Sequence, residues 1–170
     1  MCVAPQPLPE IDPPALPPGE QELWQSYLTV EQFMATNNMA GIVGEERAVL
    51  ANLGFFARMS AAEQEGLYEA FAKANTTLDR HAAALPWYER LIKLLGSPEV
   101  QRFRSQGKHV CLMGSCLMEL GDLKAARTEF LKARKLAEAH GFFQVRLRRV
   151  LLCHPRTHNR AAQTLANTKH

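Results

Sequence analysis

Helix start and stop signals recur at intervals of about 40 residues between positions 20 and 141, and this regularity constrains the fold more than any other feature of the sequence. Ser60 and Glu63 have the spacing of a capping box, in which each side chain accepts a hydrogen bond from an otherwise unpaired backbone N–H. Gly121 followed by Asp122 is typical of a helix end and the cap of the next helix. No stretch alternates apolar and polar residues for long enough to predict a strand. The sequence therefore predicts an all-α fold.

Further signals divide this region into six expected helices. Asp79 is expected to cap one of them, and Ser97 followed by Pro98 is expected to start another. The expected helices span residues 20–38, 45–58, 61–76, 80–95, 98–120 and 123–139. The first members of successive pairs begin about 40 and 37 residues apart, which is the period of an array of helical hairpins. We therefore expect three stacked antiparallel hairpins, an α-solenoid, over residues 20–141.

Residues 107–140 carry small and bulky side chains at the spacing of a helical-hairpin repeat. The positions concerned are Gly114, Leu117, Gly121, Ala126, Phe130 and Ala133. Small residues let two helix backbones approach closely, and bulky residues fill the space beside them. This pattern resembles the tetratricopeptide repeat (TPR), a family in which stacked hairpins bind protein segments. In this register Gly114 and Ala126 are expected to face each other across the hairpin.

A second, less complete copy of the pattern precedes the first by 42 residues. Its corresponding positions are Tyr68, Phe71, Ala72, Ala84, Tyr88 and Leu91. Asn75 stands where the repeat has a bulky residue. The long spacing is similar to that of the extended TPR repeats in rapsyn and the G-protein-signalling modulators. Residues 20–58 match the repeat only in helix length and spacing.

In TPR arrays the first helix of each hairpin lines a concave groove, so the resemblance assigns eight residues to a protein-binding groove. They are Lys108, Cys111, Ser115, Met118 and Glu119 in the clear repeat, and Glu69, Lys73 and Thr76 in the preceding one. They do not reproduce the Lys/Asn/Lys set with which some TPR proteins hold chaperone C-termini. Small and sulfur-containing side chains favour an apolar or helical peptide. The alternative is that Cys111 and Met118 only pack against neighbouring helices.

The cysteine and histidine patterns do not predict a catalytic or metal site. Cys111 and Cys116 are five residues apart in an expected helix, which directs their side chains about 140° from each other. His154 and His158 have the spacing of a helical metal pair, but Pro155 lies between them and interrupts a helix. No glycine-rich phosphate loop occurs. We therefore expect a non-catalytic protein without a metal ion or cofactor.

The two ends of the chain differ in composition from the expected helical region. Residues 1–19 contain seven of the ten prolines and are expected to form a proline-rich disordered arm. Residues 142–152 are expected either to form a capping helix or to begin a repeat that the chain does not complete. After Glu138 the chain holds six basic residues and no acidic one, and residues 153–170 are expected to form a basic disordered tail.

The resemblance implies an adaptor or scaffold that binds a protein segment in its groove. The alternative is electrostatic binding of nucleic acid or of an acidic membrane surface by the basic C-terminal tail. No apolar run reaches the roughly 20 residues that a membrane-spanning helix needs. The N-terminus also lacks the basic and apolar regions of an export signal. We therefore expect a cytoplasmic protein without a transmembrane segment.

Overall fold

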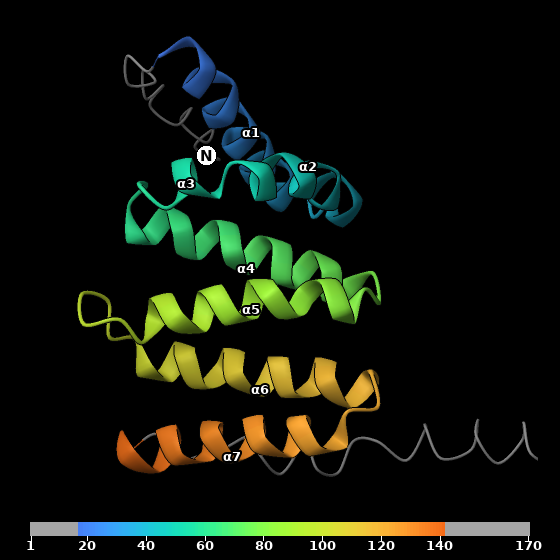
Figure 1. Cartoon of the computed structure of the whole chain (residues 1–170), viewed down its shortest axis with the longest axis vertical. Helices are drawn as coiled ribbons and strands as arrows, with labels where there is room; N and C mark the ends of the chain where they lie inside the picture. Colours follow the sequence, from blue (N-terminus) through green and yellow to red (C-terminus); the bar gives the residue numbers. More distant parts are fainter. Residues whose placement is uncertain (1–16, 142–170) are drawn as a thin grey trace, which may run out of the picture.

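The computed structural model describes residues 17–141, and every regular element in this range is a helix (Figure 1). The helices are α1 (Pro18–Ala35), α2 (Met39–Ala51), α3 (Leu53–Phe56), α4 (Ala61–Thr77), α5 (His81–Leu95), α6 (Phe103–Glu119) and α7 (Leu123–Ala139). The expected all-α class is therefore confirmed for the described residues. The last two residues of the expected arm, 18 and 19, belong to α1, and residues 1–16 of the arm lie outside the described range. The expected segments 142–152 and 153–170 also lie outside it.

Helices α4 to α7 pack against one another in chain order, and α1 and α2 form a pair beside α4 (Figure 1). Two contacts fix the directions of the last three helices. The Gln106 side chain, near the start of α6, donates a hydrogen bond of 3.1 Å to the Ile92 carbonyl near the end of α5. The Phe103 ring at the start of α6 stacks on His140 just after α7, with centroids 3.9 Å apart. Helices α5 and α7 therefore run in the same direction, and α6 runs opposite to both.

Two of the expected helix starts are confirmed in atomic detail. Ser60 Oγ accepts a hydrogen bond of 3.3 Å from the Glu63 N–H, and the Glu63 carboxylate accepts one of 2.8 Å from the Ser60 N–H. Asp122 accepts a hydrogen bond of 2.9 Å from the Ala125 N–H and so caps α7. Gly121, which precedes Asp122, has a φ of +82°, a backbone conformation that residues other than glycine rarely adopt.

The expected start of the fifth helix at residue 98 is wrong, because α6 begins at Phe103. Ser97 does begin a single helical turn, since its carbonyl accepts hydrogen bonds from the N–H groups of Val100 and Gln101. Gln101 then adopts a φ of +46°, which ends that turn. The chain changes direction at this point before α6 begins, so the turn that starts at Ser97 does not continue into α6.

Two further expectations about helix starts are corrected. The expected helix at 45–58 is instead α2, which begins six residues earlier, followed by the short α3. The Asn38 side chain caps α2 by accepting a hydrogen bond of 3.0 Å from the Gly41 N–H. Asp79 does not cap α5, because it adopts a φ of +56° and Arg80 precedes the helix without a side-chain cap.

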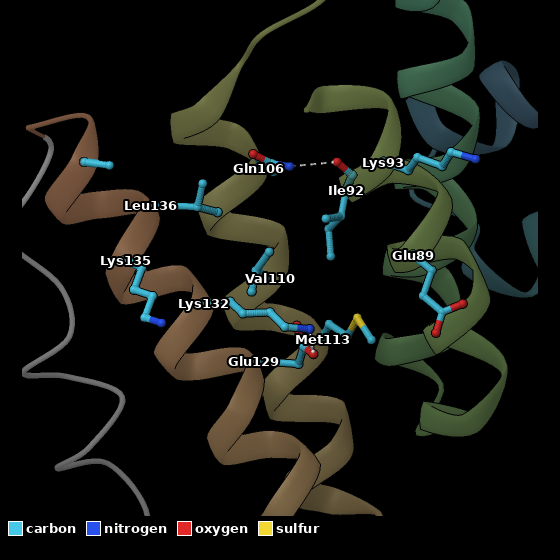
Figure 2. Close-up of a pocket in the computed structure, with 11 residues that line it drawn as sticks. Glu89, Ile92, Lys93, Gln106, Val110, Met113, Glu129, Lys132, Lys135 and Leu136 are labelled. Carbon is cyan, nitrogen blue, oxygen red and sulfur yellow. Dashed lines mark hydrogen bonds and ion pairs between the residues drawn. The ribbon is translucent and has the colours of Figure 1, made fainter. Parts of the chain in front are cut away.

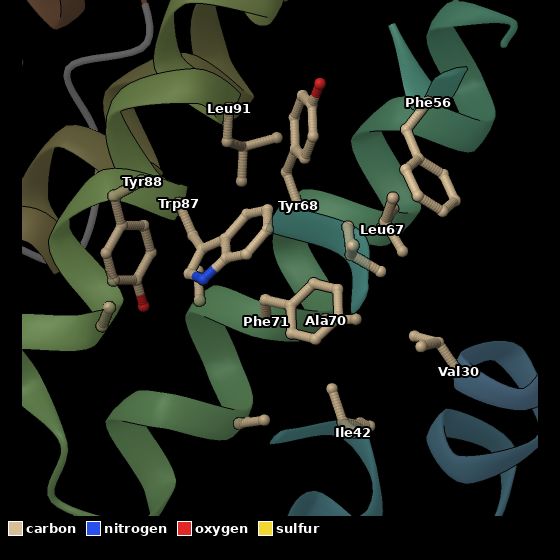
Figure 3. Packing of buried hydrophobic residues seen from close by; sticks show 14 of the residues in the cluster. Val30, Ile42, Phe56, Leu67, Tyr68, Ala70, Phe71, Trp87, Tyr88 and Leu91 are labelled. Carbon is tan, nitrogen blue, oxygen red and sulfur yellow. The ribbon is translucent and has the colours of Figure 1, made fainter. Parts of the chain in front are cut away.

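The largest buried side chains gather where α4 and α5 meet α1 and α2 (Figure 3). The rings of Phe71 and Trp87 stack with centroids 4.5 Å apart, and both side chains are buried. The six positions of the second sequence copy are all buried: Tyr68, Phe71, Ala72, Ala84, Tyr88 and Leu91. The positions of the second copy therefore belong to the hydrophobic core that α4 and α5 share.

A buried polar cluster links α2 to the α4–α5 hairpin. The Glu46 carboxylate accepts hydrogen bonds from the Trp87 indole N–H and, at 2.9 Å, from the Asn75 amide. The Arg80 guanidinium adds an ion pair of 3.3 Å. Asn75 is fully buried and also donates to the Phe71 carbonyl at 3.0 Å. The departure of Asn75 from the repeat pattern therefore has a physical reason, because an apolar side chain there could not bond to Glu46.

Candidate protein-binding site

The eight residues predicted to line a groove all lie on α4 or α6, and we call them the first-helix surface. They are Glu69, Lys73, Thr76, Lys108, Cys111, Ser115, Met118 and Glu119. Glu69 and Lys108 form an ion pair of 3.0 Å that joins the two helices. Arg102, just before α6, forms a second ion pair of 2.7 Å with Glu65 on α4. Both ion pairs join α4 to the start of α6, and the first of them is formed by two residues predicted to line the groove.

Some of the predicted polar side chains bond within the protein. The Thr76 hydroxyl lies 3.2 Å from the Tyr88 hydroxyl and 3.6 Å from the Cys116 sulfur. Ser115 donates a hydrogen bond of 3.2 Å to the Cys111 carbonyl of its own helix. Thr76 is half-buried, and its hydroxyl contacts both α5 and α6.

The remaining residues leave a surface of mixed character. Lys73, Lys108 and Glu119 are exposed, whereas Cys111 and Met118 are half-buried. Sequence reasoning missed Leu112, which is 36% exposed and lies one turn from Lys108 on α6. Leu112 could have been found from the sequence, because it is four residues after Lys108 and so lies on the same face of the expected helix. The exposed Leu112 offers apolar contact to a partner.

A buried histidine lies directly behind this surface. His109 is 2% exposed, its Nε2 lies 3.7 Å from the Glu69 carboxylate, and its ring lies beside that of Tyr88. Burial lowers the pKa of His109, and the Glu69 carboxylate opposes this shift without reversing it. Sequence reasoning did not assign His109 to the core, because a histidine carries no apolar signal.

The two described cysteines are poorly suited to nucleophilic chemistry. Burial raises the pKa of both Cys111 and Cys116, which keeps the thiols protonated at neutral pH. The thiolate is the reactive form of cysteine, so these side chains are weak nucleophiles in the folded protein. Within residues 17–141 no three His, Cys, Asp or Glu side chains are grouped so as to hold a metal ion.

The residues predicted to pack within the repeat lie mainly between α6 and α7. Ala126 and Ala133 are buried, Leu117 and Phe130 are half-buried, and Gly121 forms the turn. Gly114 is buried, and a Cβ atom at this position would lie 2.9 Å from the Phe130 ring. The close approach expected at Gly114 is therefore present, with the Phe130 ring as the neighbour where the sequence analysis expected Ala126.

A hollow, which we call the α6 groove, lies over α6 between α5 and α7 (Figure 2). Its volume is about 730 Å³. Its apolar lining consists of Ile92, Val110, Met113, Leu136 and Ala139, and its polar lining of Glu89, Lys93, Gln106, Glu129, Lys132 and Lys135. None of the residues of the first-helix surface lines it. Sequence reasoning missed this groove because its lining comes from three helices.

No protein-family model, curated protein or solved structure matches this chain. The resemblance to TPR proteins therefore rests on the residues of the repeat pattern. Among the described residues, no helix has the length and apolar character that crossing a membrane requires.

Proposed function

We propose that this protein is a non-catalytic adaptor of the TPR type, whose stacked helical hairpins, a short α-solenoid, present the first-helix surface to a segment of a partner protein. The observation that carries the proposal is the ion pair between Glu69 and Lys108. This ion pair joins one predicted groove residue of α4 to one of α6, and these two helices occupy equivalent places in the two sequence copies. The Gly114–Phe130 contact supports the same register, since a small residue there lets an aromatic ring fill the hairpin.

The chemistry of the surface favours a segment with apolar side chains. Leu112 and Met118 supply adaptable apolar area, and each Å² of apolar surface removed from water contributes roughly 25 cal/mol before the costs of association. Lys73 is exposed and forms no ion pair among the described residues, so a carboxylate on the partner would find a cation there.

A capture experiment with the full chain tests this function. The double variant Ser115→Arg with Met118→Glu places a bulky cation and an anion on the first-helix surface and should abolish capture of a partner identified with the parent chain. The matched control is Thr128→Arg with Leu131→Glu, which has the same spacing on the exposed side of α7. The control should capture the partner as the parent does, and both variants should keep the parental circular dichroism spectrum.

Two results would contradict the proposal. Equal capture by the parent and the first-helix variant would show that the partner binds elsewhere. Capture that is insensitive to both variants and lost as salt rises would support the electrostatic alternative, because phosphate contacts depend steeply on salt.

A further inference from the structure

The α6 groove has an apolar floor supplied by three different helices. Ile92 comes from α5, Val110 and Met113 from α6, and Leu136 from α7 (Figure 2). A groove between two parallel helices, floored by a third, suits the apolar face of a partner helix.

The charged residues at the rim are unevenly distributed along the groove. Lys93 on α5 and Lys135 on α7 lie toward the C-terminal ends of these two parallel helices, where Gln106 also lies. Glu89 lies one turn earlier on α5. Lys132 is offset by Glu129, with which it forms an ion pair of 2.6 Å. The groove therefore has two cations without an ion pair among the described residues, Lys93 and Lys135, toward the C-terminal ends of α5 and α7, and Glu89 lies one helical turn before Lys93.

These rim charges are available to a ligand. Lys93, Lys135 and Glu89 are exposed, and within residues 17–141 none of the three forms an ion pair. A partner can therefore pair with them without breaking an existing ion pair. Rim charges of this kind mainly set the orientation and the association rate of a partner.

We propose that the α6 groove binds an amphipathic helix of a partner protein, with the acidic N-terminal end of that helix against Lys93 and Lys135. Helices favour acidic residues in the first turn and basic residues in the last, so this polarity matches an ordinary helix. The bound helix would then run antiparallel to α5 and α7. This site is separate from the first-helix surface, and the proposal goes beyond the adaptor function proposed above.

The charge pattern distinguishes this partner from a segment of the chain itself. Residues 142–152 follow α7 closely in sequence and contain several apolar residues. They also contain Arg146, Arg148 and Arg149 and no acidic residue, so they lack a carboxylate for the cations at the rim of the groove. An acidic partner helix therefore fits the groove better than this segment does.

The test uses two synthetic peptides of identical composition with Leu at helical spacing i, i+3, i+4 and i+7. One carries Glu in its first turn and Lys in its last, and the other has these charges exchanged. Binding of each labelled peptide to the full chain is measured by fluorescence anisotropy. We expect the parent to bind the peptide with N-terminal Glu about tenfold more tightly than the other.

The two peptides can also differ in helical content, because their end charges interact differently with the helix dipole. A charge exchange in the protein tests the contribution of the groove alone. The double variant Glu89→Lys with Lys93→Glu reverses the polarity on α5 at constant net charge, and it should lower the ratio of the two affinities about tenfold. The matched control exchanges another i, i+4 pair outside the groove, Arg134→Glu with Glu138→Arg on α7. The control should leave the ratio within about twofold of the parental value.

Methyl NMR of the methionines locates the binding. The bound peptide should shift the Met113 methyl signal, assigned with Met113→Leu, and leave that of Met118 unchanged, since Met113 lines the groove and Met118 does not. A shift of Met118 alone would place the peptide on the first-helix surface and overturn this proposal without affecting the adaptor function.

Three other results would overturn the proposal. The first is no measurable binding of either peptide. The second is a ratio of the two peptide affinities that stays the same in the Glu89–Lys93 exchange variant. A ratio that changes by the same factor in the Arg134–Glu138 control counts as the same result. The third is displacement of the labelled peptide by an unlabelled peptide of residues 142–152, which would make the chain's own segment the occupant.

Discussion

Gly114 sets the distance between two helices because it has no side chain. Its α6 backbone lies so close to α7 that a Cβ atom would come within 2.9 Å of the Phe130 ring. Gly44, in contrast, lies inside α2 with open space where its Cβ would be. Replacing each glycine with alanine should therefore change the free energy of unfolding in opposite directions. Gly inside a helix is unfavourable relative to Ala unless, as at Gly114, there is no space for a Cβ atom.

We predict that Gly114→Ala lowers the free energy of unfolding by about 1 kcal/mol, because the added methyl group forces the Phe130 ring to move. Gly44→Ala should raise it by about 0.5–1 kcal/mol through its higher helix propensity. Urea unfolding followed by circular dichroism measures both changes. If the two substitutions stabilised the protein equally, the close contact between α6 and α7 at Gly114 would be wrong.

His109 gives the folded protein a dependence on pH. Its neighbours include Glu69 from α4, Tyr88 from α5 and the adjacent Lys108, and burial holds its pKa below the ordinary value of 6.5. The unfolded chain, with the ordinary pKa, takes up a proton as the pH falls below this value, whereas folded His109 resists it. The contribution to stability is therefore complete above pH 6.5 and decreases as the pH falls below it.

We predict that the melting temperature of the parent falls between pH 7.5 and pH 5.5, and that His109→Gln reduces this fall. Gln keeps a polar group of similar length but does not titrate. Melting curves at several pH values, compared at constant ionic strength, measure the difference. An equal fall in the parent and in the variant would assign the pH dependence to other groups.

At the scale of elements, the polar cluster at Glu46 decides how the α1–α2 pair meets the α4–α5 hairpin. The carboxylate is nearly buried and accepts hydrogen bonds from Trp87 on α5 and Asn75 on α4. These donors come from two helices, so the carboxylate has to lie between them. A buried carboxylate with several donors fixes one arrangement of helices more narrowly than apolar contacts do.

We predict that Glu46→Gln lowers the free energy of unfolding by roughly 1–3 kcal/mol, because the ion pair with Arg80 and the charged hydrogen-bond acceptor are both lost. Glu45→Gln, the neighbouring residue, forms no ion pair among the described residues and should change stability by less than about 0.5 kcal/mol. Chemical denaturation of both variants makes the comparison. Equal effects would show that the cluster contributes nothing beyond a change of surface charge.

Across the whole molecule, the principal helix contacts join elements that are close in sequence. Helix α7 packs mainly on α6, whereas α4 packs on α1, α2 and α5. The fully buried aromatic side chains Phe71 and Trp87 lie on α4 and α5, while the buried residues of α7 are three alanines and one glutamate. Local stability should therefore be highest in the middle of the chain and lower at α7.

We predict that native-state hydrogen exchange is slowest for the backbone amides of α4 and α5 and faster for those of α7. Opening of α7 exposes little buried area, whereas opening of α4 or α5 exposes the main core. Mass spectrometry of peptic fragments resolves the three helices. Equal protection from α4 to α7 would show that these helices open only as one cooperative unit.

The sequence by itself determined the features that depend on residues close together in the chain. The capping box at Ser60 and the Gly121–Asp122 turn were predicted correctly because each needs only a few neighbouring residues. The six positions of the second repeat copy, which are buried on α4 and α5, were identified from the spacing of small and bulky residues along the chain. The predicted start of α6 was wrong because the residues around Ser97 do not indicate the positive φ of Gln101. That residue lies where the chain turns between packed helices.

Only the tertiary structure decided which side chains meet across helices. The α6 groove exists because α5 and α7 lie on either side of α6, and no motif in one segment encodes that spacing. The Gln106 side chain reaches the end of α5 through space that a Cβ atom at Gly96 would occupy. The buried Glu46 likewise joins residues about 30 and 41 positions away in sequence. Local hydrogen bonds fix where helices begin, whereas the packing of distant side chains fixes the distances between helices and so shapes the surfaces for which we propose partners.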